Sequence, residues 1–238
     1  MKNLSQKRLG EFVSEDYRNG AVFEKHQLDC SCKGKRALKV ACQEKGVDEA
    51  TVLNELGQVW QSGKLCYSFN PETASLAELA EYIIKTHHFY VRNELPIIMG
   101  HLVKIASKHG DLFPEMIEVA KLFEELKAEF ELHMQKEESI LFPRIKELEE
   151  FKLSGKVVNM DIPTLKSPIL LMEHDHDQSG SVMAVIRKLS DNYTPPKGAC
   201  YTYKLAMAEL ETFEMDLHRH VHLENYILFP KALNLLVS

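Results

Sequence analysis

An eleven-residue phrase occurs twice in this chain, 87 residues apart. The first copy runs from His133 to Pro143 and the second from His220 to Pro230, and both end in Ile-Leu-Phe-Pro. Each copy opens with a His that is followed four residues later by a Glu. Positions i and i+4 lie on one face of an α-helix, about one turn apart. The repeat therefore predicts two similar helical hairpins, each presenting an imidazole beside a carboxylate.

Four long amphipathic patterns follow residue 75, and short connections join most of them. Ser75 and Glu78 form a capping-box pattern that opens the first helix, and Pro96 is expected to kink it. Ser167-Pro168 is expected to start the third helix, because proline suits the first helical turn. We expect an all-α fold, with an antiparallel four-helix bundle over residues 75–238. The four helices are predicted at about residues 75–108, 111–150, 167–191 and 199–235.

Residues 1–66 have a different character, with short helical patterns separated by glycines. We interpret them as a small domain of short helices that contains Cys30 and Cys32. A segment of this size is marginal for an independent hydrophobic core. We therefore expect this leading domain to pack against the bundle.

The composition of the chain excludes several classes of function. The 238 residues carry a formal net charge of −6, which gives no basic surface for nucleic acid. No stretch approaches the ~20 apolar residues of a membrane span, and the first residues lack the apolar core of a signal peptide. The five scattered cysteines are typical of reduced thiols. We therefore expect a cytoplasmic protein with no nucleic-acid or membrane partner.

The first and third predicted helices carry a matching histidine pair, His88 and His176, which lie 88 residues apart. With the first connection near residues 109–112, His88 and His133 each lie about 21 residues from it, roughly 30 Å along a helix. His176 is nearer to its connection than His220 is. Part of residues 191–200 must therefore be irregular if all four histidines share one layer.

The repeat and its partner helices together predict a site for two metal ions. Imidazole with carboxylate, and without thiolate, suits Fe, Mn or Zn more than Cu(I). A single His-x-x-x-Glu is usually a solvated pair, so the prediction depends on the duplication. Glu173, three residues before His176, is a candidate additional carboxylate. The six predicted ligands are His88, His133, Glu137, His176, His220 and Glu224.

Other histidines close to these positions leave alternatives open. His218 and His222 are themselves four residues apart and compete with the pair of His220 and Glu224. We prefer His220 because it alone stands four residues before Glu224, as His133 stands before Glu137. We expect His87, His174, His218 and His222 to face solvent or groups that support the ligands.

These motifs resemble hemerythrin-like bundles, and more narrowly the di-iron proteins of iron–sulfur cluster repair (the repair-of-iron-centres family). The leading domain is also similar to that family's small first domain, so the resemblance covers nearly the whole chain. The matching pieces are His88 eight residues before Pro96, the two phrases from His133 and His220, His176-Asp177 with Gly180, and Leu28-Asp-Cys30-Ser-Cys32-Lys-Gly34.

The resemblance implies that the four histidines are terminal ligands of two irons. Glu137 and Glu224 would bridge the irons, together with an oxo or hydroxo group. Oxygen-carrying hemerythrins use a fifth histidine, whereas here Met172 and Gly180 flank His176 at a distance of four residues. The family's leading domain usually has two adjacent cysteines, whereas this chain has Cys30-Ser-Cys32. Cys30 and Cys32 are candidates for a redox pair or for contact with a cluster or partner, and the alternative is two ordinary reduced thiols near a turn.

The resemblance implies repair of iron–sulfur clusters damaged by nitrosative or oxidative stress, through donation of iron. The implied partners are damaged or apo iron–sulfur proteins, nitric oxide or oxygen as small ligands, and a second copy of the chain as a candidate dimer. One alternative is an enzyme that reduces nitric oxide at the di-iron site with electrons from Cys30 and Cys32. A gas- or redox-sensing module and a metal-free structural bundle are the others.

Overall fold

The computed structural model describes residues 4–16, 19–30, 33–61, 69–155 and 162–237. Within this part of the chain the regular elements are helices, and one isolated antiparallel bridge joins Arg8 to Ala37. The all-α prediction is therefore confirmed. No helix in the described ranges is both long and apolar enough to cross a bilayer.

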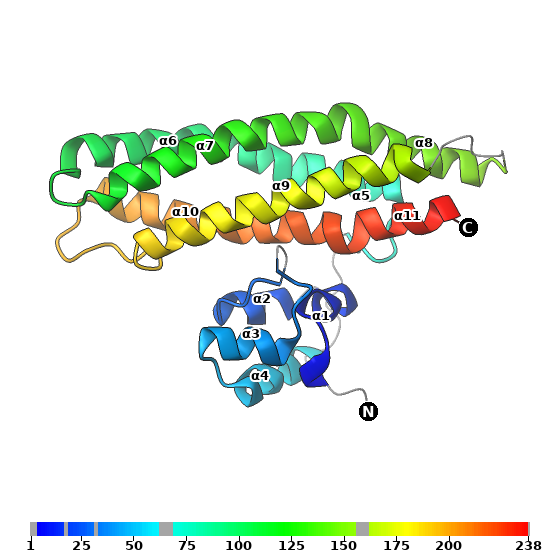
Figure 1. Cartoon of the computed structure of the whole chain (residues 1–238), viewed down its shortest axis with the longest axis horizontal. Helices are drawn as coiled ribbons and strands as arrows, with labels where there is room; N and C mark the ends of the chain where they lie inside the picture. The colour runs from blue at the N-terminus through cyan, green and yellow to red at the C-terminus, as the bar shows by residue number, and fades with distance from the viewer. Residues whose placement is uncertain (1–3, 17–18, 31–32, 62–68, 156–161, 238) are drawn as a thin grey trace.

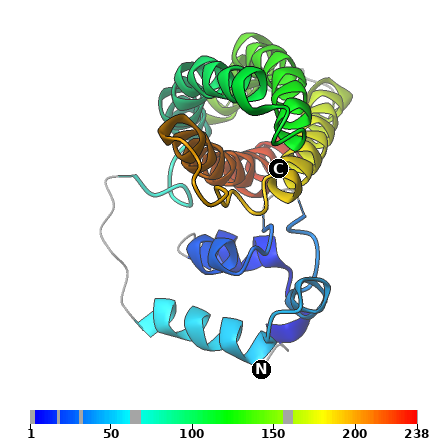
Figure 2. The ribbon, with the colours of Figure 1, turned by 90° about the vertical axis from the view of Figure 1, so that its left-hand side faces the viewer.

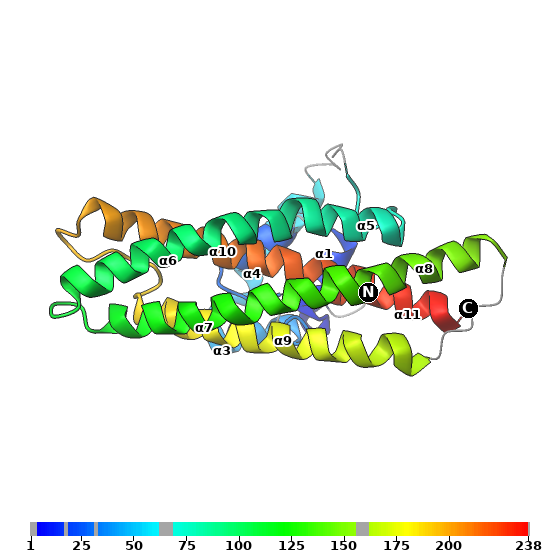
Figure 3. The same cartoon turned by 90° about the horizontal axis from the view of Figure 1, so that it is seen from above.

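Four long rods run side by side to form a bundle (Figures 1 and 3). Viewed end-on, they enclose a common axis, and the leading domain lies outside the ring (Figure 2). The first rod consists of α5 (Leu76–Ile83), η2 (Ile84–His88) and α6 (Phe89–His109), and the second of α7 (Glu115–Lys136), η3 (Glu137–Leu141) and α8 (Phe142–Leu153). The third rod is the single helix α9 (Ile162–Leu189). The fourth consists of α10 (Tyr201–His222), η4 (Leu223–Leu228) and α11 (Phe229–Val237).

The start of the first rod follows the sequence pattern, whereas the start of the third does not. Ser75 Oγ accepts a hydrogen bond from Glu78 N, and Glu78 Oε2 accepts one from Ser75 N, which completes the capping box. The third rod begins at Ile162, so Pro168 lies inside α9 and the predicted start at Ser167-Pro168 is wrong. Proline lacks the N–H that would reach the carbonyl four residues earlier. Arg144 Nη1 donates to that carbonyl, the oxygen of Thr164, at 3.1 Å.

Three of the rods contain a short π-helical segment, and the segments are η2, η3 and η4. A π-helical turn adds one residue to the helix and so changes which side chains face the bundle axis. His88 ends η2, Glu137 begins η3 and Glu224 lies in η4. Such turns occur frequently at functional sites. Each of these rods therefore departs from the regular α-helix where a predicted metal ligand lies.

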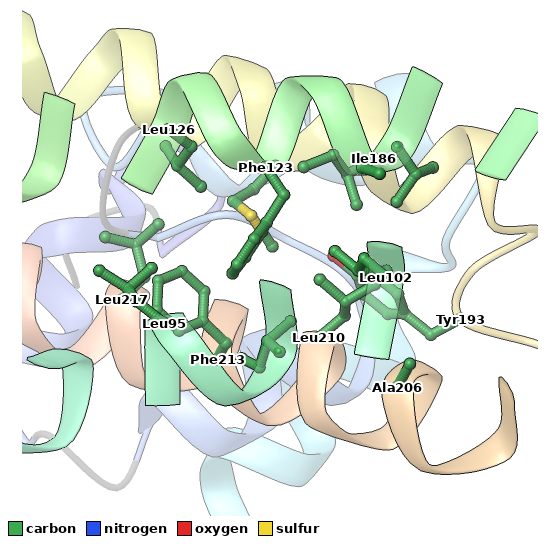
Figure 4. Close-up of a cluster of buried hydrophobic side chains, with 14 of the residues drawn as sticks. Leu95, Leu102, Phe123, Leu126, Ile186, Tyr193, Ala206, Leu210, Phe213 and Leu217 are labelled. Atoms are coloured by element: carbon green, nitrogen blue, oxygen red, sulfur yellow. The ribbon is translucent and has the colours of Figure 1, made fainter. Parts of the chain in front are cut away.

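Two apolar clusters fill the bundle on either side of the level at which His88, Glu137 and Glu224 lie. One packs α6, α7, α10 and the end of α9, and includes Phe123 and Phe213 with ring centroids 5.5 Å apart (Figure 4). The other packs α5, α8, α11 and the start of α9, and includes Phe142 and Phe229. The clusters separate the predicted ligands from both ends of the bundle.

The connection between α9 and α10 is irregular, as the sequence required. Asp191, Asn192 and Tyr193 all have positive φ angles of 49° to 59°. The Tyr193 hydroxyl donates to Glu214 Oε2 at 2.7 Å, and Arg187 Nε donates to the same oxygen at 2.8 Å. This buried network holds the connection in a conformation that non-glycine residues rarely adopt.

The leading domain contains η1 (Leu4–Gln6), α1 (Leu9–Glu15), α2 (Asn19–Lys25), α3 (Leu38–Lys45) and α4 (Glu49–Gln61). Its own apolar core includes Phe12 and Phe23. Buried Asn19 donates through Nδ2 to Phe12 O at 2.7 Å, which links α2 to α1. The domain lies beside the bundle, near α10 and α11 (Figures 1 and 2).

Candidate metal centre

The six side chains predicted as ligands converge between the two apolar clusters. Each is at most 4% exposed, although two are carboxylates and four are imidazoles. They form two groups that share both glutamates, and within each group the candidate ligand atoms all lie within 4.8 Å of one another. The first group is His88, Glu137, His220 and Glu224, and the second is His133, Glu137, His176 and Glu224.

The two shared carboxylates lie between the groups. Glu137 Oε2 is 3.4 Å from His88 Nε2 and 3.4 Å from His133 Nε2. Glu224 directs Oε1 toward His220 Nε2 at 3.0 Å and Oε2 toward His176 Nε2 at 3.1 Å. A carboxylate placed in this way can bind one ion of each group.

The buried oxygens of this cluster fit a metal better than they fit the protein alone. Both carboxylate oxygens of Glu137 and Oε2 of Glu224 accept no well-oriented hydrogen bond from the described part of the chain, although imidazole nitrogens lie 3.4 Å from Glu137 Oε2 and 3.1 Å from Glu224 Oε2. A buried polar atom without a partner is costly, and buried charges are normally paired or bind metals. Four imidazoles and two carboxylates therefore have the chemistry and the burial of a site for divalent cations.

The shared carboxylates also shift the pKa values of nearby groups. Burial alone would lower the pKa of His88, but Glu137 and Glu224 outweigh it and raise the pKa to about 10. The pKa of His133 is also about 10, because Glu137 and Asp175 outweigh its burial. Burial and the charge of Glu224 would raise the pKa of Glu137, but the imidazoles lower it to about 2. Without metal, His88 and His133 thus remain protonated at neutral pH.

The other ring nitrogens of three histidines meet polar partners. His88 Nδ1 lies 2.6 Å from Glu138 Oε1, and His176 Nδ1 lies 2.9 Å from Asn225 Oδ1. His133 Nδ1 is 3.4 Å from Asp175 Oδ2. Partners of this kind fix the tautomer and the ring orientation of metal-binding histidines.

The sequence prediction missed these supporting residues, although the repeat contained a signal for two of them. Glu138 and Asn225 each directly follow a shared glutamate and are 87 residues apart. Each contacts the histidine of the preceding rod, His88 or His176. The repeat therefore extends from the predicted ligands to the residues that orient them.

The remaining histidines only partly follow the prediction. His174 is exposed, as expected. His87 is buried; its Nδ1 lies 2.9 Å from Asp216 Oδ1, and its ring stacks on His220 at 5.6 Å, so it supports a candidate ligand. His222 is 4% exposed and stacks on Tyr226, so solvent exposure was wrong for this residue.

The other candidate site residues lie outside both groups. Glu173 forms an ion pair with Lys35 of the leading domain at 3.5 Å and belongs to neither group. Cys30 is buried, and its thiol is not in a disulfide. Cys32 lies outside the described residues, so the structure does not address the predicted thiol pair.

Residues 79–232 match the family model of the hemerythrin HHE cation-binding domain. The chain belongs to the hemerythrin HHE family. Residues 5–59 match a second model, ScdA_N, which is described as a domain of unknown function. Both groups of candidate metal ligands fall within residues 79–232, the range matched by the HHE model. The resemblance seen in the sequence is thereby confirmed for both parts of the chain.

Curated relatives match nearly the full length of this HHE-family chain. A probable iron–sulfur cluster repair protein of Haemophilus influenzae is 34% identical over 98% of this chain and 99% of its own. The iron–sulfur cluster repair proteins YtfE of Enterobacter sp. (strain 638) and Escherichia coli O81 are 34% and 33% identical, each over 94% of this chain and 96% of their own. The combination of the two domains is therefore shared with proteins named for cluster repair.

Proposed function

We propose that this protein binds two iron ions at the candidate centre and donates iron to iron–sulfur clusters damaged by nitrosative or oxidative stress. The observation that carries the proposal is the full-length similarity to cluster repair proteins, which includes both domains. The six clustered side chains provide the chemistry that the proposal needs. Its partners would be damaged or apo iron–sulfur proteins.

The chemistry of the donor set suits a site that holds iron and releases it. His88 and His220 would hold one ion, His133 and His176 the other, and the two shared carboxylates would hold both. Bound Fe(II) would supply exchangeable iron and a redox couple. Imidazole and carboxylate bind Fe(II) less tightly than thiolates bind soft metals, and protons compete for the imidazoles. The residues thus permit release in a way that a thiolate site would not.

Iron transfer to an apo-cluster protein tests the proposal. The full chain would be loaded with isotope-labelled iron and mixed with an apo iron–sulfur protein and sulfide under anaerobic conditions. Labelled clusters should form faster than in a control with the same amount of free iron. Cluster formation no faster than with free iron would contradict donation.

Substitution of the shared carboxylates tests the ligand set. Glu137→Ala or Glu224→Ala should strongly reduce the content of both ions, since each carboxylate lies between the two groups. Glu129→Ala is a matched control, because Glu129 is an exposed carboxylate one turn before His133 on the same helix. Full iron retention in both variants would show that the proposed ligands are wrong.

A second candidate function is the reduction of nitric oxide. Two ions held by these six side chains would have further coordination positions available for a small ligand. The reaction needs an electron donor, and Cys30 with Cys32 remains a prediction for that role. Sustained formation of nitrous oxide with an added reductant would support catalysis, whereas a single stoichiometric burst would oppose it.

A further inference from the structure

The segment that carries Glu224 also contacts the leading domain. Within η4, Glu224 is shared by both candidate groups, and Asn225 orients His176. The next residue, Tyr226, reaches Gly10 and Gly34 of the leading domain. Three consecutive residues therefore contribute a candidate ligand, a partner that orients another candidate ligand, His176, and an interdomain contact.

Gly10 and Gly34 form a slot that fits the Tyr226 side chain, and we call these two residues the glycine slot. Gly10 N donates to Gly34 O at 3.0 Å, so the two glycines are adjacent although they lie far apart in sequence. A Cβ added at Gly10 would lie only 2.6 Å from two carbons of the Tyr226 ring. A Cβ added at Gly34 would overlap the Tyr226 hydroxyl and the carbonyl of Cys30. A larger residue at Gly10 would therefore meet the Tyr226 ring alone, whereas one at Gly34 would also displace the backbone of Cys30.

Two further contacts hold Tyr226 and its surroundings. On the bundle side, the Tyr226 ring stacks on buried His222, with centroids 5.1 Å apart and planes at 15°. Across the interface, Lys35, the residue after Gly34, pairs with Glu173 at 3.5 Å. Glu173 lies three residues before His176, so this ion pair joins the leading domain to a helix that carries a candidate ligand.

We propose that the leading domain acts as a clamp on the metal centre, with Tyr226 in the glycine slot as the positioning contact. While the ring is held, η4 keeps Glu224 and Asn225 in place, and metal is retained. Displacement of the leading domain frees η4 and accelerates metal loss. The clamp rests on the proposed function, for which it provides a control of iron release.

Thermodynamic linkage makes the clamp reciprocal. If docking strengthens metal binding by some factor, metal binding must strengthen docking by the same factor. Such couplings are typically about 5- to 150-fold. Metal loading should therefore make the full chain more compact, which small-angle X-ray scattering measures as a smaller radius of gyration.

The main experiment measures metal loss from the full chain to an excess of chelator, with Fe(II) alone as the probe. Gly10→Ala should accelerate loss roughly 5-fold or more, in line with a typical coupling. Gly57→Ala is the matched control, because it lies in the same domain and an added Cβ there meets nothing within 4 Å. The control should release metal at the wild-type rate.

A double-mutant comparison shows whether the effect passes through Tyr226. Tyr226→Ala alone should also accelerate metal loss, and adding Gly10→Ala should have little further effect because the overlapping ring is gone. Circular dichroism confirms that each variant remains helical. Two results would overturn the clamp. One is a wild-type rate of metal loss in both single variants. The other is that Gly10→Ala accelerates metal loss in the Tyr226→Ala background as much as it does in the wild-type chain.

The chelator experiment needs no client protein and is independent of the donation test. A chain that fails to build clusters but shows the expected release rates would retain the clamp and lose the donor role. A chain that donates iron while both variants release metal at the wild-type rate would retain the donor role and lose the clamp.

Discussion

Metal loading should release about two protons per chain near neutral pH. Without metal, buried Glu137 and Glu224 are negative, and their charges keep His88 and His133 protonated, each with a pKa of about 10. Two imidazolium groups thus balance two carboxylates in the interior. A metal-bound imidazole must be neutral, so metal has to displace both protons.

The size of the effect distinguishes this cluster from four ordinary histidines. At pH 7.5 a group with a pKa of about 10 is almost fully protonated, so His88 and His133 together release close to two protons. Four histidines with the ordinary pKa of about 6.5 would carry roughly 0.1 proton each and release about 0.4 in total. The two cases differ about fivefold.

The same protons set the pH dependence of stability without metal. The folded pKa of His88 and His133 lies above the unfolded value of about 6.5. Their stabilisation is therefore fully present below about pH 6.5 and is lost as pH rises through about 10. The metal-free protein should melt at a lower temperature at pH 10 than at pH 7, whereas the loaded protein should change less.

Isothermal titration calorimetry in buffers of different ionisation heat measures the protons released. A metal that is stable in air, such as Zn(II), can be used for the titration, with Fe(II) repeated under anaerobic conditions. His133→Ala should reduce the release to about one proton per chain, and replacement of the exposed His174 by Ala should leave it unchanged. Release of less than half a proton from the fully loaded wild-type chain would refute the charge balance.

Three other substitutions test the supporting structure. Glu214→Ala leaves the Arg187 guanidinium without its partner and should cost about 3–5 kcal/mol in the free energy of unfolding, measured by denaturant titration. Asn225→Ala removes the contact with His176 Nδ1 and should weaken metal binding about 10- to 100-fold in chelator competition, with little change in the unfolding of the metal-free chain. Phe123→Ala empties part of the fully buried core and should cost about 3–5 kcal/mol, while metal content per folded chain stays constant.

The repeat made the six clustered residues predictable from the sequence because helical spacing fixes which face a residue occupies. His133 and Glu137 share a face by the i, i+4 rule, and the second copy repeats the pair at His220 and Glu224. The partner histidines, His88 and His176, followed from their own 88-residue spacing, and hairpin geometry supported the pairing of His88 with His133. All six lie in one buried layer.

The features that the sequence did not predict depend on contacts between distant segments. The π-helical turns at His88 and Glu137 leave no simple residue pattern, because one extra residue only shifts the helical phase. Pro168 is tolerated within α9 because Arg144 satisfies the carbonyl of Thr164. That contact lies 20 residues away in sequence and has no local signal.

The two halves of the bundle differ where the leading domain docks, and this difference determines which carboxylate the clamp can control. Adding 87 to Ser139 gives Tyr226, so the repeat places these residues at equivalent positions. Ser139 is exposed and donates to Gln135 O within its own helix, whereas Tyr226 enters the glycine slot. The leading domain therefore contacts the copy with Glu224 through a residue that the copy with Glu137 lacks. Ser139→Ala should leave metal release unchanged in the chelator assay, and acceleration as large as that of Tyr226→Ala would show that release does not depend on the docked half.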